Sequence, residues 1–145
     1  MKNDKNILII EPERIAGLEL QQQLEKKGFS VTRPISLIDA EVIIENKKPD
    51  LVIADTDIKK QLPFARIKKY VSKLKLPFIW IGTLTTKEIK KESKGINVIG
   101  TFPKPFDSKK VVALIINYFK SLFQKKQGVN DATFKKSCVT STQTI

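Results

Sequence analysis

The sequence contains no histidine and only one cysteine, Cys138, among its 145 residues. Histidine-based zinc sites, serine–histidine–aspartate triads and histidine general bases are therefore excluded, and no internal disulfide can form. No apolar run approaches the roughly 18 residues of a membrane span, and residues 1–6 are too polar for a signal peptide. These absences predict a soluble protein of a reducing compartment, which we take to be the cytoplasm.

The composition and the hydrophobic pattern predict one α/β domain. Hydrophobic residues make up 41% of the chain and charged residues 29%, a balance typical of a globular protein. Short apolar runs alternate with helical patterns five times. The predicted strands are 7–10, 29–32, 51–54, 77–81 and 96–102, and the predicted helices lie between Glu13 and Gly28, between Ser36 and Pro49, and over 63–74, 87–94 and 108–123.

This alternation predicts a three-layer, doubly wound parallel sheet with helices on both faces. The domain is expected to span residues 1–123, and the Lys-, Ser- and Thr-rich residues 124–145 are expected to form a flexible tail. Right-handed crossovers place the carboxyl ends of all the strands at one edge of the sheet, where such folds bind their ligands.

Charged side chains follow three of the predicted strands at that edge. Glu11 and Glu13 follow the first strand, Asp55 and Asp57 the third, and Lys104 the fifth. Carboxylates from neighbouring strands suit Mg²⁺, and the lysine could pair with an aspartate or with a phosphoryl group that the aspartate carries. The spacing fits equally well a set of loop-capping carboxylates around a salt bridge, so both interpretations remain open.

Three stretches resemble the receiver domain of two-component response regulators: 7–11 (Ile-Leu-Ile-Ile-Glu), 49–55 (Pro-Asp-Leu-Val-Ile-Ala-Asp) and 104–106 (Lys-Pro-Phe). The resemblance covers residues 6–123 and implies a flavodoxin-like, five-stranded sheet of order 2-1-3-4-5. By resemblance, Asp55 holds the phosphoacceptor position and Lys104 that of the phosphoryl-contacting lysine. Asp57 would offer a backbone carbonyl to a metal, and the peptide bond before Pro105 would be cis.

The chain also departs from that family at several positions. Pro12 stands where the family has a second acidic residue, which leaves Glu11, Asp55 and Asp57 as at most a weak Mg²⁺ site. The positions usually held by a Thr or Ser hydroxyl and by an aromatic switch residue are also altered, and we assign them to Gly82 with Thr83 beside it, and to Thr101. These departures predict a degenerate phosphorylation site, as in a pseudo-receiver.

Charge is divided unevenly along the chain. Residues 1–57 hold 8 basic and 11 acidic side chains, a net of −3, whereas residues 58–145 hold 19 and 4, a net of +15. Such asymmetry predicts an acidic partner, with a merely solvated lysine-rich surface as the alternative. By resemblance, the partner surface comprises the fourth helix, fifth strand and fifth helix, and its lysines are Lys87, Lys90, Lys91, Lys94, Lys109 and Lys110.

The function predicted first is a stand-alone signalling module of phosphorelay type that acts through protein contacts and is not an enzyme. Its partner would be a histidine kinase or a downstream acidic target. A homodimer through the same elements is a further option, because Leu114, Ile116 and Phe123 exceed what the core face of the last helix needs, unless they are ordinary packing. The alternative function is non-specific nucleic-acid binding by the lysine-rich half. The scarcity of arginine and the lack of any nucleic-acid-binding motif weigh against it.

Overall fold

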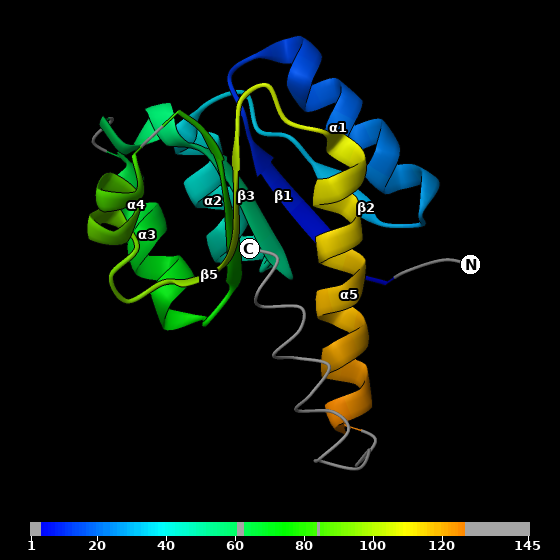
Figure 1. The fold of residues 1–145 in the computed structure, drawn as a ribbon. Helices are drawn as coiled ribbons and strands as arrows, with labels where there is room; N and C mark the ends of the chain where they lie inside the picture. The colour runs from blue at the N-terminus through cyan, green and yellow to red at the C-terminus, as the bar shows by residue number, and fades with distance from the viewer. Residues whose placement is uncertain (1–3, 61–62, 84, 127–145) are drawn as a thin grey trace. The chain divides into compact units, whose positions relative to one another are not determined.

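The structure, a computed structural model of the chain, describes residues 4–60, 63–83 and 85–126. The described residues fall into two units, which divide between Ser108 and Lys109 and are described separately. The first unit contains one all-parallel sheet of order β2-β1-β3-β4-β5 (Figure 1). Its strands are β1 (Asn6–Ile10), β2 (Ser30–Thr32), β3 (Leu51–Asp55), β4 (Pro77–Gly82) and β5 (Asn97–Pro103). The predicted fold class and strand order are confirmed.

The helices begin where the sequence offers capping side chains. The Ser36 hydroxyl accepts a hydrogen bond from the backbone N–H of Asp39, and the Thr85 hydroxyl accepts one from Glu88, which satisfies first-turn donors of α2 and α4. Gly28 follows the end of α1 with a φ of 92°, the left-handed conformation that glycine tolerates best. The helices are α1 (Arg14–Lys26), α2 (Leu37–Lys47), the 3₁₀ helix η1 (Thr56–Lys60), α3 (Pro63–Lys73), α4 (Thr86–Glu92) and α5 (Ser108–Lys126).

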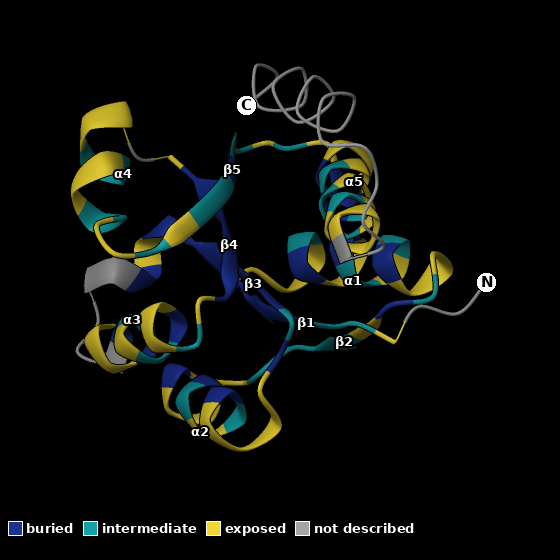
Figure 2. Ribbon diagram, turned by 90° about the horizontal axis from the view of Figure 1, so that it is seen from below, coloured by how far each residue is buried: buried dark blue, intermediate teal, exposed yellow. Residues whose placement is uncertain are grey.

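Helices cover both faces of the sheet in the first unit. Figure 2 shows α2, α3 and α4 on one face and α1 on the other, with buried residues gathered along the strands between them. Because side chains alternate along a strand, Leu8, Val52 and Phe78 pack with α2 and α3. Burial on both faces explains why the central strands read as unbroken apolar runs.

Trp80 lies at the centre of the core and has no exposed surface. Its ring centroid is 5.6 Å from that of Phe64 and 4.8 Å from that of Phe78, and its Nε1 donates to the Ser93 hydroxyl at 3.0 Å. The indole therefore buries a large apolar area and still satisfies its one donor. This environment gives Trp80 a packing role in the core.

The two last helices differ in extent from their predictions. The fourth begins and ends earlier and has only seven residues, because Thr85 caps it and Ile89 is its one large apolar residue. The fifth continues through Gln124 to Lys126, residue types that favour helix. The remainder of the predicted tail, 127–145, lies outside the described residues. No helix in the described part of the chain is long and apolar enough to cross a bilayer.

Candidate functional site

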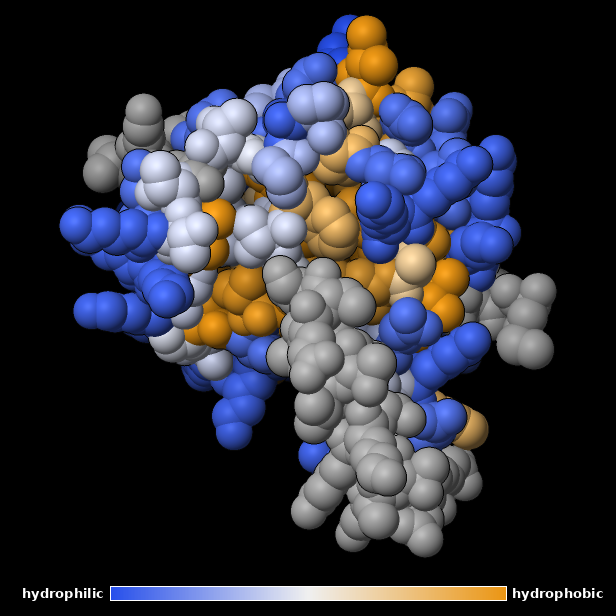
Figure 3. Space-filling view, in the orientation of Figure 1, coloured by the Kyte–Doolittle hydropathy of each residue, from blue (hydrophilic) through white to orange (hydrophobic). Residues whose placement is uncertain are grey.

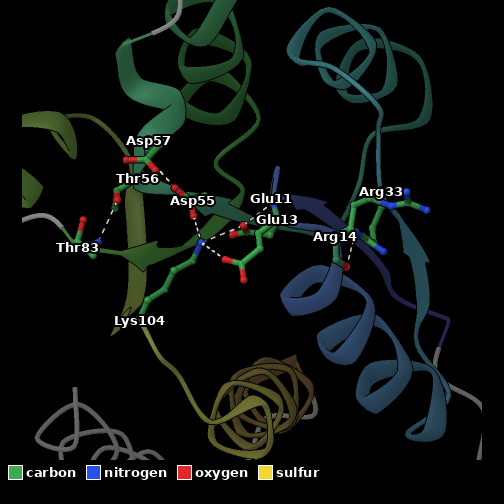
Figure 4. Close-up of polar contacts among 9 residues, drawn as sticks. All are labelled: Glu11, Glu13, Arg14, Arg33, Asp55, Thr56, Asp57, Thr83 and Lys104. Carbon is green, nitrogen blue, oxygen red and sulfur yellow. Dashed lines mark hydrogen bonds and ion pairs between the residues drawn. The ribbon is translucent and has the colours of Figure 1, made fainter.

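Lys104 draws together acidic side chains from the ends of β1 and β3 (Figure 4). Its Nζ lies 2.9 Å from Glu11 Oε1 and 3.4 Å from Glu13 Oε2, and it forms an ion pair with Asp55 Oδ2. The backbone N–H of Lys104 donates to the Gly82 carbonyl at 3.0 Å, which fixes the segment after β5 against the end of β4. The Lys104–Pro105 peptide bond is cis, as the resemblance implied. The predicted convergence of Glu11, Asp55 and Lys104 is therefore present.

The Glu11 carboxylate is fully buried and turns back toward its own loop. Its Oε1 accepts a hydrogen bond of 2.9 Å from the backbone N–H of Glu13 in addition to the contact with Lys104. Its Oε2 is buried without a hydrogen-bond donor among the described residues. An ionised carboxylate with one bare oxygen is costly in a buried position, which favours the protonated form of Glu11.

The Asp55 carboxylate, at the end of β3, is also buried. Its Oδ1 accepts a hydrogen bond of 2.7 Å from the backbone N–H of Asp57, and its Oδ2 pairs with Lys104. The Asp57 side chain itself is exposed and stands outside the cluster around Lys104 (Figure 4). Asp55 thus caps the turn that opens η1 and supplies the main counter-ion of the lysine.

Burial and mutual contact set the protonation of the three groups. Burial, aided by a hydrogen bond with Asp55, raises the pKa of Glu11 to about 7. Burial also acts against ionisation of Asp55, but hydrogen bonds with Lys104 and Glu11 outweigh it and lower the pKa of Asp55. Burial opposes the charge of Lys104 as well, yet its bonds to Asp55 and Glu11 raise its pKa above the ordinary value. Near neutral pH, Lys104 and Asp55 are charged while Glu11 exchanges a proton.

This geometry has the features of loop-capping carboxylates around a salt bridge. Among residues 4–60, 63–83 and 85–126, no group of three or more Asp, Glu, His or Cys side chains is arranged to hold a metal ion. Glu11 and Asp55 could offer two carboxylates, but the ammonium of Lys104 contacts both. Pro12 adds no ligand. The residues therefore do not fit a well-formed Mg²⁺ site, and a magnesium ion would compete with Lys104 for its oxygens.

The end of β4 shows how the chain accommodates a glycine at the position expected for Thr or Ser. Gly82 has a φ of 146°, and a Cβ built there would overlap the Thr56 side chain. The Thr56 hydroxyl accepts a hydrogen bond of 3.2 Å from the backbone N–H of Thr83, whose own side chain is exposed. A buried hydroxyl next to Asp55 therefore fills the space that a side chain at position 82 would need. Sequence reasoning missed Thr56, although a threonine directly after the acceptor position was a visible signal.

The remaining predicted positions lie away from this cluster. Thr101 is half-buried on β5, opposite Trp80 of β4. Three exposed lysines, Lys87, Lys90 and Lys91, lie on α4, and a fourth, Lys94, follows its end and is also exposed; together they are called the lysines of α4 below. Figure 3 shows strongly hydrophilic side chains projecting from the edge of the molecule where α4 lies.

The predicted residues beyond Ser108 belong to the second unit. Lys109 and Lys110 are exposed on α5, so a surface that joins them to the lysines of α4 stays a prediction. Leu114 and Ile116 are half-buried, whereas Phe123 is 64% exposed. Homodimerisation through these elements stays a prediction too.

Comparison with known proteins finds similar sequences and similar folds. No family model matches the chain. The chain is 29% identical over 115 residues to the probable transcriptional regulator ycf29 of Porphyra purpurea; the match covers 77% of this chain and 55% of that protein. This chain therefore spans about half the length of the curated relative it matches.

Solved structures with the same fold include several receiver domains. A two-component response regulator from Clostridium difficile superposes with a TM-score of 0.71 and 19% identity, over 81% of this chain and 97% of that one. The HemR receiver domain of Leptospira biflexa superposes with a TM-score of 0.66 and 21% identity, over 79% of this chain and 93% of that one. The signal receiver domain of a modulated diguanylate cyclase from Desulfovibrio desulfuricans G20 superposes with a TM-score of 0.63 and 24% identity, over 76% of this chain and 89% of that one. The chain is thus receiver-like and has the flavodoxin-like fold of response regulator receiver domains.

Proposed function

We propose that the chain is a signalling module of the two-component type, which acts through protein–protein contacts and carries a degenerate phosphoacceptor site at Asp55. The observation that carries the proposal is the contact of Lys104 with Asp55 at the carboxyl edge of a receiver-type sheet. A lysine in this position can stabilise either the free carboxylate or a phosphoryl group formed on it. The receiver domains that share the fold support a signalling role.

The degenerate character follows from what surrounds Asp55. Phosphorylation needs divalent metal to offset the charge of the incoming phosphoryl group, and Pro12 supplies no ligand where the family has a second acid. Gly82 lacks a hydroxyl, and the Thr56 hydroxyl is engaged with the backbone of Thr83. We infer that Mg²⁺ binds weakly and that Asp55 accepts phosphate poorly.

The partner we propose is an acidic protein surface. The three lysines within α4 and Lys94 just after it are exposed and close together in sequence, and Glu88 and Glu92 are the only acidic residues of that helix. Complementary charge mainly raises association rates and favours correct orientation. A histidine kinase or a downstream acidic target meets this requirement. Nothing in the described residues favours the nucleic-acid alternative.

The test is intact-mass analysis after incubation with acetyl phosphate and Mg²⁺. One phosphoryl group adds about 80 Da, and we expect little of this adduct on the native chain. Pro12→Asp, which restores an acidic residue after β1, is expected to increase the labelled fraction several-fold. Asp55→Asn in the same background should remove it. Near-complete labelling of the native chain would overturn the degenerate site, and labelling that survives Asp55→Asn would overturn Asp55 as the acceptor.

A further inference from the structure

A hollow of about 700 Å³ lies beside the acidic cluster, between the carboxyl ends of β1 and β2 and the start of α2. Apolar side chains line much of it, and they include Ile10, Ile35, Leu37 and Ile58. Its volume is within the range of sites that bind small molecules, roughly 300–1,000 Å³. Neither the signalling role proposed above nor the contacts of Lys104 account for this hollow.

Two of the chain's three arginines line the hollow. The chain has 27 basic residues, and only Arg14, Arg33 and Arg66 are arginines. Arg66 lies on α3, where it pairs with Glu41 at 3.7 Å, whereas Arg14 and Arg33 both line the hollow. Arginine differs from lysine in presenting a planar fork of donors that matches the two oxygens of a carboxylate or phosphate.

The guanidinium of Arg33 is held by one hydrogen bond, but one of its buried N–H donors has no acceptor among the described residues (Figure 4). Its Nη2 donates to the backbone carbonyl of Arg14 at 3.2 Å, and its Nε is buried without a hydrogen-bond partner among the described residues. Neither Arg14 nor Arg33 has an acidic side chain within 4.0 Å in the described part of the chain. A buried donor without an acceptor is destabilising unless water or a ligand supplies one.

Gly17 explains how the guanidinium reaches this position. It lies within α1, and a Cβ built on it would be 2.6 Å from Nη2 and 2.8 Å from Cζ of Arg33. The absence of a side chain at position 17 therefore lets the guanidinium lie directly against the helix. A glycine inside a helix costs roughly 0.5–1 kcal/mol relative to alanine, so this position gives up helix stability where it accommodates Arg33.

Glu11 also lines the hollow and is the one acidic residue that could oppose an anion there. Its Oε1 is already paired with Lys104 at 2.9 Å, which offsets its charge. The two guanidiniums thus leave the hollow with an excess of positive charge next to apolar walls.

We propose that this hollow binds a small amphipathic oxyanion, whose carboxylate or phosphate head pairs with Arg33 and Arg14 and whose apolar body lies against Ile35, Leu37 and Ile58. The inference stands independently of the signalling role, because it uses neither Asp55 nor the lysines of α4. A ligand bound there would lie beside Glu11 and so next to the cluster around Lys104.

The three arginines make a direct measurement practical. In ¹⁵N-correlated NMR spectra their Nε–H groups give three separate signals, which single Arg→Lys variants assign. Hexanoate and hexyl phosphate serve as probes. Acetate and inorganic phosphate are controls that keep the charged group but lack the apolar chain, and hexanol is a control that keeps the chain but lacks the charge. We expect saturable shifts of the Arg33 and Arg14 signals with one or both hexyl probes and none at Arg66. The head that binds more tightly identifies the class of oxyanion.

The apolar walls should make affinity rise with chain length, by roughly fourfold for each methylene that becomes fully buried. Parallel shifts of all three arginine signals, or equal affinity for acetate and hexanoate, would show non-specific anion binding and overturn the proposal. Absence of any shift with every probe would overturn it as well.

Two variants separate the site from the fold. Arg33→Lys keeps the charge but loses the fork and should weaken binding by about tenfold, while Arg66→Lys, the matched control, should leave it unchanged. Gly17→Ala should displace the guanidinium and weaken binding without lowering the melting temperature. Native affinity in both Arg33→Lys and Gly17→Ala would show that Arg33 does not bind the head.

Discussion

The cluster around Lys104 and the hollow beside Arg33 lie at the same edge of the sheet and have opposite charge balance. In the first, one ammonium contacts three carboxylates, and in the second, two guanidiniums have no acidic partner among the described residues. Buried charges are tolerated when they are paired. The ammonium of Lys104 therefore has its counter-ions within the chain, whereas the two guanidiniums have none among the described residues.

The comparison also separates the roles of the two regions. Lys104 is needed by the fold because Glu11 and Asp55 are buried around it. Arg33 is only half-buried, and its hydrogen bond to the backbone carbonyl of Arg14 neutralises no buried charge. Substitutions in the first region should therefore act mainly on stability, and substitutions in the second mainly on binding.

The largest effect is expected from Lys104→Met. This substitution leaves Asp55 and Glu11 buried without their counter-ion, and removal of one partner of such a pair should lower the free energy of unfolding by about 3 kcal/mol. Urea unfolding at pH 7 measures the loss. Lys110→Met, at an exposed lysine, is the matched control and should change stability by less than about 0.5 kcal/mol. An equally small loss for Lys104→Met would show that solvent replaces the lysine and that the pairing is not structural.

The next largest effect on stability is expected when alanine replaces Gly82, and alanine at Gly17 provides the comparison. Gly82→Ala forces a side chain into the space of Thr56 at a φ of 146° and should destabilise the fold by about 2 kcal/mol. Gly17→Ala meets only the flexible end of Arg33 within a helix, and it should be neutral or stabilising by up to about 1 kcal/mol. Thermal and urea unfolding of both variants provide the comparison.

A double variant tests whether the overlap with Thr56 causes the loss of stability in Gly82→Ala. Gly82→Ala combined with Thr56→Gly should recover part of the lost stability, because the overlap is removed while the backbone strain remains. Equal destabilisation by alanine at positions 17 and 82 would contradict the contrast between a glycine packed against a buried side chain and one packed against the flexible end of an arginine.

A smaller effect is expected in the dependence of stability on pH. Because folding raises the pKa of Glu11 from 4.5 to about 7, its contribution to stability is full below pH 4.5 and is lost as the pH rises through 7. The pKa of Asp55 is lowered instead, so its contribution is present above pH 3.8 and is lost in more acidic solution. The two contributions change in different pH ranges.

Glu11→Gln removes the first of these changes and keeps a hydrogen-bonding side chain of similar shape. Relative to the native chain, the variant should gain about 1–2 kcal/mol of stability between pH 5 and pH 8, less than the full shift implies because Lys104 remains partly solvated. Urea unfolding at four pH values measures the difference. Parallel stability profiles would mean that Glu11 titrates as an ordinary exposed carboxyl.

The fold was predictable from the sequence because local signals and the global pattern agree. The apolar runs at 7–10 and 51–54 are buried on both faces, and Ser36 caps its helix as expected. The ends of α4 and α5 were less predictable, since the fourth helix has little apolar content and the fifth continues beyond its last apolar residue, Phe123, in good helix formers.

The site was only partly predictable for a physical reason. Glu11, Asp55 and Lys104 follow the carboxyl ends of parallel strands, so the topology of the sheet brings them to one edge independently of side-chain packing. Side-chain partners depend on three-dimensional packing. Thr56 directly follows the acceptor position, but no local pattern shows that it fills the space beside Gly82, and none shows that Arg33 packs against Gly17.

The smallest effect on stability, and the one that bears on function, is expected from the lysines of α4. Replacing Lys87, Lys90, Lys91 and Lys94 by Gln removes four exposed charges, each of which contributes about 0–1 kcal/mol to stability at most. The melting temperature should therefore stay nearly unchanged, while capture of an acidic partner slows at low salt and converges with that of the native chain at high salt, where charges are screened. Association kinetics with a partner isolated by pull-down, measured at both salt concentrations, test this expectation. A matched replacement of Lys26, Lys27, Lys47 and Lys48, which lie at the ends of α1 and α2, changes net charge equally and should leave the rate closer to native. Equal slowing by both sets would reduce the effect to net charge, and no slowing by either would leave the lysines of α4 as a solvated face.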